Sequence, residues 1–374
     1  MKKTQVALAA LAMLASSAVL ADVAVKGCVD AAIVSTDAGT VLGGAGDGCA
    51  SQMGFYASEE IGDMKASINL ETGFSTNNGA IGNGGNTSST GVFNRLANVG
   101  LGTKAATVTL GMAKSAWIEA AGGGLTAYGM NGIGVPALAV LNPNLSGTSQ
   151  AGGFFVGNIV GLSGDLGTFS YNIQSTVNDA ASTTTYTPSS GSANTVAVTG
   201  TSDSFTALRL SAPAGAATLN FGYESRKNAP ATALTAGNID YTNWVASASL
   251  PLDGGFSVNA AYAKQSVGTG QTYTTNYVGR NVAAEQTGYI LGASYKMSDA
   301  VGFGVTYAKN NNQTDMFGAS AQYNFSATTV GYANYADFSN AFALNNGGTA
   351  QSFAVGTTTG YTGKVMSIGI HHAF

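Results

Sequence analysis

The last fourteen residues of the chain, YTGKVMSIGIHHAF (361–374), alternate between two kinds of side chain. Counted back in twos from the end, one set is mostly large and apolar: Phe374, His372, Ile370, Ile368 and Met366. The other set is small or polar: Ala373, His371, Gly369, Ser367 and Val365. A strand of a membrane barrel needs one face for lipid and one for the lumen. The stretch therefore predicts a transmembrane β-strand.

The same period of two recurs in segments of about ten residues, the length of a membrane-crossing strand. Sixteen such segments are predicted, near residues 23–34, 50–58, 64–74, 92–102, 105–113, 151–162, 166–176, 205–213, 216–226, 238–250, 255–266, 284–297, 300–310, 314–327, 329–337 and 361–374. An even number of antiparallel strands closes a barrel with both chain ends on one side. The predicted fold is therefore an all-β, antiparallel transmembrane barrel of sixteen strands.

The connections between these segments are short and long in turn. Seven are tight and carry turn residues, such as Gly62-Asp63 and Asp253-Gly254, and would face the periplasm. The long ones are rich in Gly, Asn, Thr and Ser and would face outside. The connection near residues 114–150 is different, because its segment 129–141 is largely apolar. Exposing such a loop to water is costly, so we expect it to fold into the lumen.

Composition and the N-terminus agree with an exported membrane barrel. Only 9% of residues are charged, against about a quarter in soluble domains, and no basic tract indicates nucleic acid. Lys2 and Lys3 precede a short apolar run, and small residues lead up to Ala21, which is the pattern of a signal peptide. We predict a signal peptide at 1–21 and one barrel domain at 22–374. Cleavage leaves 13 basic and 19 acidic residues, a net charge of −6.

Cys28 and Cys49 are the two cysteines of the chain. Export places them in an oxidising compartment, where a disulfide closing the first loop can form. Strand parity argues against the bridge, because Cys28 falls on the inward set of its strand and Cys49 on the outward set of the next. The other interpretation is a pair of small apolar fillers, and both stay open.

Several motifs are similar to those of the general porins of Gram-negative bacteria, especially the β-proteobacterial branch. The chain reads VKGCVDA at 25–31, SQMGFYASEEIG at 51–62, NLETGF at 69–74 and TVTLG at 107–111. The clear resemblance covers residues 22–115 and the C-terminal strand. It implies a homotrimeric outer-membrane protein with a water-filled pore for small solutes and ions, narrowed by the third external loop. It also implies contacts with lipid, lipopolysaccharide and the barrel assembly machinery, for which Phe374 would be the signal.

The chain departs from that family at the constriction. Gln52 and Met112 stand where arginines are usual, and Val135-Pro136-Ala137-Leu138 replaces a loop segment with a carboxylate. No Lys or Arg occurs between Lys114 and Arg209. We therefore expect an uncharged constriction and weak ion selectivity, since fixed charges in a narrow passage are what bias ion sign. The net charge of −6 favours a mild preference for cations.

The residues predicted to line the pore or its constriction are Asp30, Gln52, Tyr56, Glu71, Met112, Tyr128, Met130 and Arg209. Asp30 and Glu71 fit a hydrogen-bonded wall better than a solute site. Arg95 shares strand parity with Phe93 and Val99, which places it at the outer edge of its strand, where it would bond loops. The family resemblance alone does not make it a pore residue. Apolar loop residues such as Ile133 and Leu138 would either guide partly apolar solutes or anchor the loop, and anchoring is favoured.

Three other functions are alternatives to a general diffusion pore. A channel preferring a partly apolar solute rests on the apolar loop. A secreted structural or adhesive β-protein suits the glycine content, but no repeat of 20–50 residues supports it. An enzyme is disfavoured, because the two histidines, His371 and His372, are adjacent on opposite faces of the last strand and form no triad. No cofactor and no cluster of metal ligands is expected.

Overall fold

The structure is a computed structural model that describes residues 22–36, 39–43, 48–77, 79, 81, 92–128, 133–141, 154–177, 184–186, 196–198, 204–229, 239–268, 285–311, 315–342 and 361–374. The predicted signal peptide, its cleavage site and Met130 lie outside these residues. The domain boundary therefore stays a prediction.

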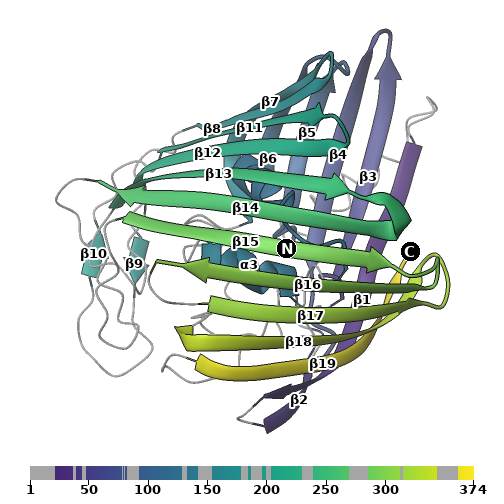
Figure 1. Ribbon diagram of the computed structural model, residues 1–374. Coiled ribbons are helices and arrows are strands. Elements are labelled where there is room, and N and C mark those ends of the chain that lie inside the picture. The colour runs from purple at the N-terminus through teal and green to yellow at the C-terminus, as the bar shows by residue number, and fades with distance from the viewer. Residues whose placement is uncertain are drawn as a thin grey trace.

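Sixteen antiparallel strands form the barrel wall (Figure 1): β1 (Asp22–Thr36), β3 (Gln52–Ile61), β4 (Met64–Gly73), β5 (Leu96–Gly102), β6 (Thr107–Lys114), β7 (Phe155–Leu166), β8 (Phe169–Thr176), β11 (Ser204–Ala214), β12 (Ala217–Ala229), β13 (Ile239–Pro251), β14 (Phe256–Val267), β15 (Glu285–Lys296), β16 (Val301–Asn310), β17 (Asp315–Asn324), β18 (Thr329–Phe342) and β19 (Tyr361–Ala373). The strand β2 (Gly39–Gly43) pairs with the second half of β1. A separate two-stranded sheet holds β9 (Thr184–Tyr186) and β10 (Val196–Val198).

The first and last wall strands close the barrel. On one edge, β1 pairs with β3 through residues 22–28, and on the other it pairs with β19 through residues 28–36. Beyond that ladder, the amide of Phe374 donates to the carbonyl of Gly27 (3.1 Å), and the amide of Gly27 donates back (3.0 Å). The predicted sixteen-stranded antiparallel barrel is confirmed.

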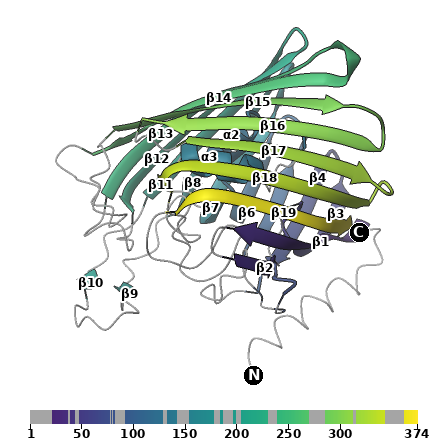
Figure 2. The same cartoon turned by 60° about the horizontal axis from the view of Figure 1, so that its bottom comes forward.

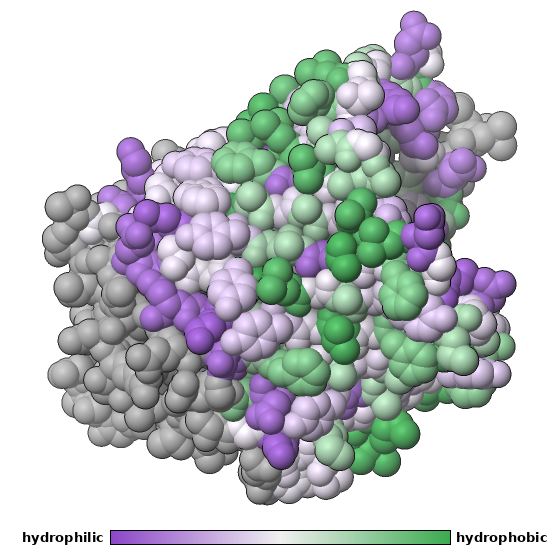
Figure 3. All heavy atoms as spheres, viewed as in Figure 1, coloured by the Kyte–Doolittle hydropathy of each residue, from purple (hydrophilic) through white to green (hydrophobic). Residues whose placement is uncertain are grey.

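Side chains alternate across this wall as the sequence predicts. Val25, Val29 and Ile33 are exposed on the outer face of β1, whereas Cys28 and Asp30 between them are buried inside. In Figure 3, apolar side chains cover the middle of the strands and hydrophilic ones gather toward their ends. Among the described helices, none is long and apolar enough to cross a membrane.

Strand ends differ from the prediction where turns or irregular pairing intervene. β3 extends to Ile61 and meets β4 at Met64, because Gly62 takes the left-handed conformation (φ 61°) that the tight turn requires. β5 begins at Leu96, four residues later than predicted near 92, and β18 continues to Phe342 past an irregularity in its pairing with β19. Alternation locates strands well, but it does not locate their ends.

Three short helices complete the described fold: α2 (Ala116–Gly122), α3 (Val135–Leu141) and the 3₁₀ helix η4 (Asp253–Gly255). Both α2 and α3 belong to the connection between β6 and β7. Figures 1 and 2 show them between opposite walls of the barrel. α2 packs against β11, β12 and β13, and α3 packs against β15, β16 and β17. The largest buried apolar cluster joins the two helices to the inner face of the wall.

Candidate functional site

The helix α2 is fixed to the inner wall at its N-terminus. Ser115 caps the helix by accepting from the amide of Trp117 (3.2 Å), and its hydroxyl donates to Glu224 on β12 (3.1 Å). The Trp117 side chain is almost fully buried. At the other end, Ser247 on β13 donates to the carbonyl of Ala120 (2.6 Å). Polar contacts at both ends and an apolar face between them hold α2 inside the barrel.

Gly222 on β12 provides the space in which α2 sits. A Cβ at this position would lie 2.7 Å from the Cβ of Ala120 and 2.9 Å from Val245. We therefore expect Gly222→Ala to displace the helix and destabilise the barrel by about 1–3 kcal/mol, the usual cost of overpacking. The measurement is the temperature at which the folded band disappears on a heat-modifiability gel.

The control for this variant is Gly161→Ala on β7. A Cβ there meets nothing closer than 3.6 Å, so this barrel should be unchanged or slightly more stable. Equal unfolding temperatures for the two variants would show that α2 does not depend on Gly222.

The helix α3 is anchored in a similar way. Ile133, Leu138 and Val140 are buried, and the Cβ of Ile133 would lie 2.8 Å from a Cβ added at Gly318 on β17. Asn310 on β16 donates to the carbonyl of Val140 (3.1 Å). The three side chains are buried and Ile133 contacts the wall, which supports the anchoring interpretation. The side chain of Val135 lies outside the described residues.

An ion pair occupies the inner wall where β4 meets the start of β5. The Arg95 guanidinium donates to one oxygen of Glu71, and Tyr56 on β3 donates to the other oxygen (2.7 Å). Arg95 also lies over the Phe155 ring, 4.7 Å from its centroid. Arg95 lies directly before β5, at the edge of the strand as predicted, but its partner there is Glu71 on β4 rather than a loop.

A second ion pair links α2 to the wall. Glu119 on the helix lies 4.0 Å from Arg209 on β11, and Asn172 on β8 donates to the same carboxylate (3.0 Å). Arg209 also contacts Asn220 (3.5 Å). The segment at Val135 lacks the carboxylate that the family resemblance leads one to expect there. The same connection nevertheless carries a carboxylate on α2, that of Glu119.

Lys114 lies between these two pairs. It ends β6, directly before α2, and its side chain is exposed. Its ammonium is within electrostatic range of both pairs, Glu71–Arg95 and Glu119–Arg209, and it forms no ion pair among the described residues. The charged residues near α2 are therefore three cations and two anions. The predicted uncharged constriction thus differs from the structure, in which charges are present but largely balanced.

Of the other predicted pore residues, Gln52 and Tyr128 lie on inner faces. Gln52 is opposite Cys28, so it shares the inward face of β1, and Tyr128 lies against Gly302 on β16. Met112 is half-buried directly after Gly111, whose φ of 126° coincides with a register shift between β6 and β7. Alternation does not fix the orientation of Met112 across that irregularity.

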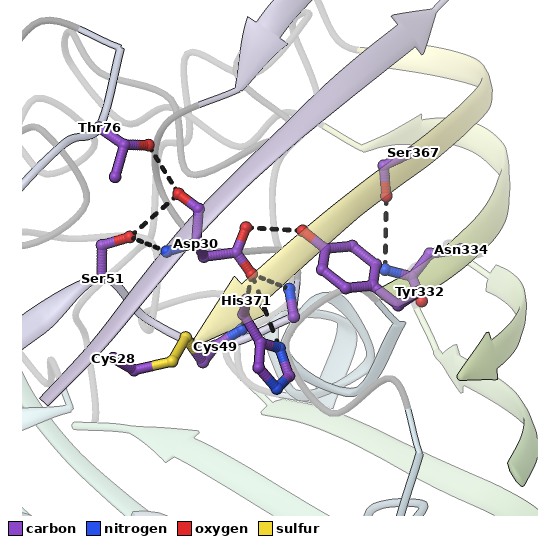
Figure 4. A network of polar contacts seen from close by, with 10 residues as sticks. Cys28, Asp30, Cys49, Ser51, Thr76, Tyr332, Asn334, Ser367 and His371 are labelled. Carbon is purple, nitrogen blue, oxygen red and sulfur yellow. Dashed lines mark hydrogen bonds and ion pairs between the residues drawn. A yellow bond between two sulfur atoms is a disulfide. The ribbon is translucent and has the colours of Figure 1, made fainter. Parts of the chain in front are cut away.

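Asp30 is the centre of a polar network at the seam between β1 and β19 (Figure 4). One carboxylate oxygen accepts from the amides of Gly48 (2.7 Å) and Cys49 (2.9 Å), and the other accepts from the Tyr332 hydroxyl (2.6 Å). His371 Nδ1 is 4.0 Å from the carboxylate. The network ties the first external loop to three strands of the wall.

A disulfide joins Cys28 to Cys49 in this network, with 6.5 Å between the Cα atoms. The parity argument against the bridge was wrong, because Cys49 precedes β3 and lies in a bend rather than in the strand. A bridge that closes 21 residues stabilises a fold by about 3 kcal/mol in the chain-entropy model.

Comparison with known proteins identifies this architecture. A family model described as Gram-negative porin matches residues 7–363. The chain belongs to the Gram-negative porin family. None of the curated proteins matches the sequence. This porin is therefore an outer-membrane β-barrel channel, as the resemblance of residues 22–115 implies.

Three solved structures share the fold at low sequence identity. The anion-selective porin from Comamonas acidovorans is 19% identical, with a TM-score of 0.68 over 95% of this chain and 100% of that one. OmpT of Vibrio cholerae is 12% identical, with a TM-score of 0.61 over 96% and 99% of the two chains. OmpF of Salmonella typhi in complex with daunomycin is 12% identical, with a TM-score of 0.61 over 94% and 97%.

Three charged residues of this porin were missed from the sequence: Arg95, Lys114 and Glu119. Arg95 lies directly before β5, Lys114 is the last residue of β6, and Glu119 lies on α2, so the period of two carries no information about them. Lys114 had one signal, since it is the last basic residue before a long stretch with none. Glu119 had a weaker one, an acidic residue in the first turn of a short helix.

Proposed function

We propose that this porin is a passive diffusion channel for small hydrophilic solutes and ions, with a constriction of low net charge and weak ion selectivity. The observation that carries the proposal is the pairing of lumenal charges, Glu71 with Arg95 and Glu119 with Arg209. An ion pair is a local dipole whose field falls off faster than that of a single charge. A passage lined by such pairs biases neither ion sign strongly.

The proposed pore wall comprises Asp30, Gln52, Tyr56, Glu71, Tyr128 and Arg209, with Arg95, Lys114 and Glu119 added from the structure. Phe374 is proposed as the assembly signal. A homotrimer in contact with lipid and lipopolysaccharide is proposed as the working form. A trimer form of Vibrio cholerae OmpT, 11% identical with a TM-score of 0.60, supports a barrel of this shape in such an assembly.

The proposal is tested by recording the purified protein in a planar bilayer under a salt gradient. We expect conductance steps in groups of three and a reversal potential near zero. A strong preference for either ion sign would contradict a charge-balanced constriction. Single, ungrouped steps would contradict the trimer.

Lys114 is expected to set the residual selectivity, because it is the exposed cation between two neutralised pairs. Lys114→Gln should move the reversal potential toward cations while leaving the step size nearly unchanged. The matched control is Lys65→Gln, which removes the same charge from an exposed pair with Glu60 beside the β3–β4 turn. An equal shift in both variants would mean that total charge, rather than position, decides selectivity.

A channel for a partly apolar solute receives less support. That alternative requires the apolar loop to face the passage, but Ile133 packs against Gly318 of the wall and Leu138 is buried. The secreted structural protein is likewise disfavoured by membership in a family of channels.

A further inference from the structure

Four residues with metal-binding side chains meet at the β1–β19 seam: Cys28, Asp30, Cys49 and His371, here called the seam cluster. Cys28 and Asp30 are two positions apart on the inward face of β1, and His371 is the direct cross-strand partner of Asp30. Cys49 reaches the same place from the first loop through its bond to Cys28. Figure 4 shows these side chains converging.

The ligand atoms of the seam cluster are close together. One carboxylate oxygen of Asp30, the Cys49 sulfur and one ring nitrogen of His371 all lie within 4.8 Å of one another. His371 Nδ1 is buried and has no hydrogen-bond partner among the described residues, although it lies 4.0 Å from Asp30. Alternation within one strand does not indicate this group, because residues 30, 49 and 371 are distant in sequence and meet only where the barrel closes.

We propose that the seam cluster binds Zn²⁺ or a similar divalent ion when the Cys28–Cys49 disulfide is reduced. Two thiolates, one imidazole and one carboxylate form a four-donor set suited to tetrahedral zinc. Reduction by a phosphine and water yields two thiols and a phosphine oxide. Binding of the ion then releases the two thiol protons, so charge and atoms balance.

The surroundings of the cluster already orient its ligands. Tyr332 and the amides of Gly48 and Cys49 hold the Asp30 carboxylate, as outer hydrogen bonds do in metal sites. Three of the four donors are on neighbouring wall strands, so their spacing is set by the β1–β19 register. Only Cys49, which lies outside the strands, has to move after the sulfur–sulfur bond breaks.

The full-length barrel in detergent, reduced with a phosphine, should bind one Co²⁺ per chain. Cobalt reports the ligands directly, through a thiolate-to-cobalt absorption band and the visible bands of a tetrahedral ion. Zinc should displace it. The oxidised barrel should show no such bands, and a reduced barrel that stays folded on a gel yet binds no cobalt would overturn the proposal.

Two histidine variants distinguish binding of cobalt by the whole seam cluster from binding by the two thiols alone. His371→Gln should weaken cobalt binding by more than about tenfold, because a ligand is lost. His372→Gln is the matched control, since His372 contacts Thr329 (2.8 Å) and points away from the cluster. Equal affinities for the two variants would overturn the proposal.

A further variant avoids the reductant, should reduction unfold the barrel. Cys28→Ala has no disulfide and keeps Asp30, Cys49 and His371. It should bind cobalt through one thiolate, and adding Asp30→Asn should abolish this binding. Cobalt binding unaffected by Asp30→Asn would show that Cys49 binds the ion without Asp30, which would contradict the proposed metal site. This inference does not depend on the proposed solute or ion selectivity.

Discussion

A chain that lacks Phe374 is expected not to accumulate as a folded barrel in the outer membrane. Two independent effects combine in this deletion. The aromatic end is the proposed assembly signal, and Phe374 also makes the last pair of hydrogen bonds of the barrel seam with Gly27. Its ring lies over Gly27, where a Cβ would come within 2.6 Å of the Phe374 ring. The measurement is the amount of heat-modifiable barrel in the outer-membrane fraction.

Two controls separate assembly from stability. Phe374→Tyr keeps an aromatic ring and the seam hydrogen bonds, so we expect near-normal amounts. The deleted chain is also refolded in detergent without any assembly machinery. If it refolds as well as the complete chain, the defect lies in recognition. If refolding fails equally, Phe374 acts through packing at the seam, and the proposed signal role would be wrong.

The barrel itself could be predicted from the sequence because the alternating pattern that indicates it lies within each single strand. Alternation within β1, β16 or β19 depends only on which side chains face lipid, and each strand repeats the signal. The count and the closure follow from sixteen such segments with short and long connections. Tertiary contacts are not needed for any of these steps.

The candidate site could be predicted only in part, because its contacts join residues outside the strand interiors. Strand parity predicts the inward face for Glu71, but it does not predict the partner Arg95, since Arg95 precedes β5. The sequence leaves the Cys28–Cys49 bridge open for the same reason, because Cys49 precedes β3. Alternation carries no information beyond a strand end, and Arg95, Lys114 and Glu119 lie at or beyond such ends.

Removal of the Arg95 charge is expected to have the second large effect. Arg95→Met keeps an apolar side chain over Phe155 but leaves the nearly buried Glu71 carboxylate without this cation. Breaking a buried pair on one side costs roughly 3–5 kcal/mol, because the remaining charge is neither solvated nor neutralised. The barrel should therefore unfold at a clearly lower temperature on a heat-modifiability gel. The variant that still folds should also shift its reversal potential toward cations.

The double variant Glu71→Gln with Arg95→Met shows whether an unpaired charge is the cause. It removes both charges, so most of the lost stability should return, and selectivity should return toward zero. Lys264→Met is the matched control, because its pair with Glu285 is largely exposed and should be worth less than about 1 kcal/mol. A double variant as unstable as Arg95→Met would mean that the guanidinium acts through its other contacts. The Glu71–Arg95 pair would then no longer support a charge-balanced constriction, and Glu119–Arg209 would be its remaining support.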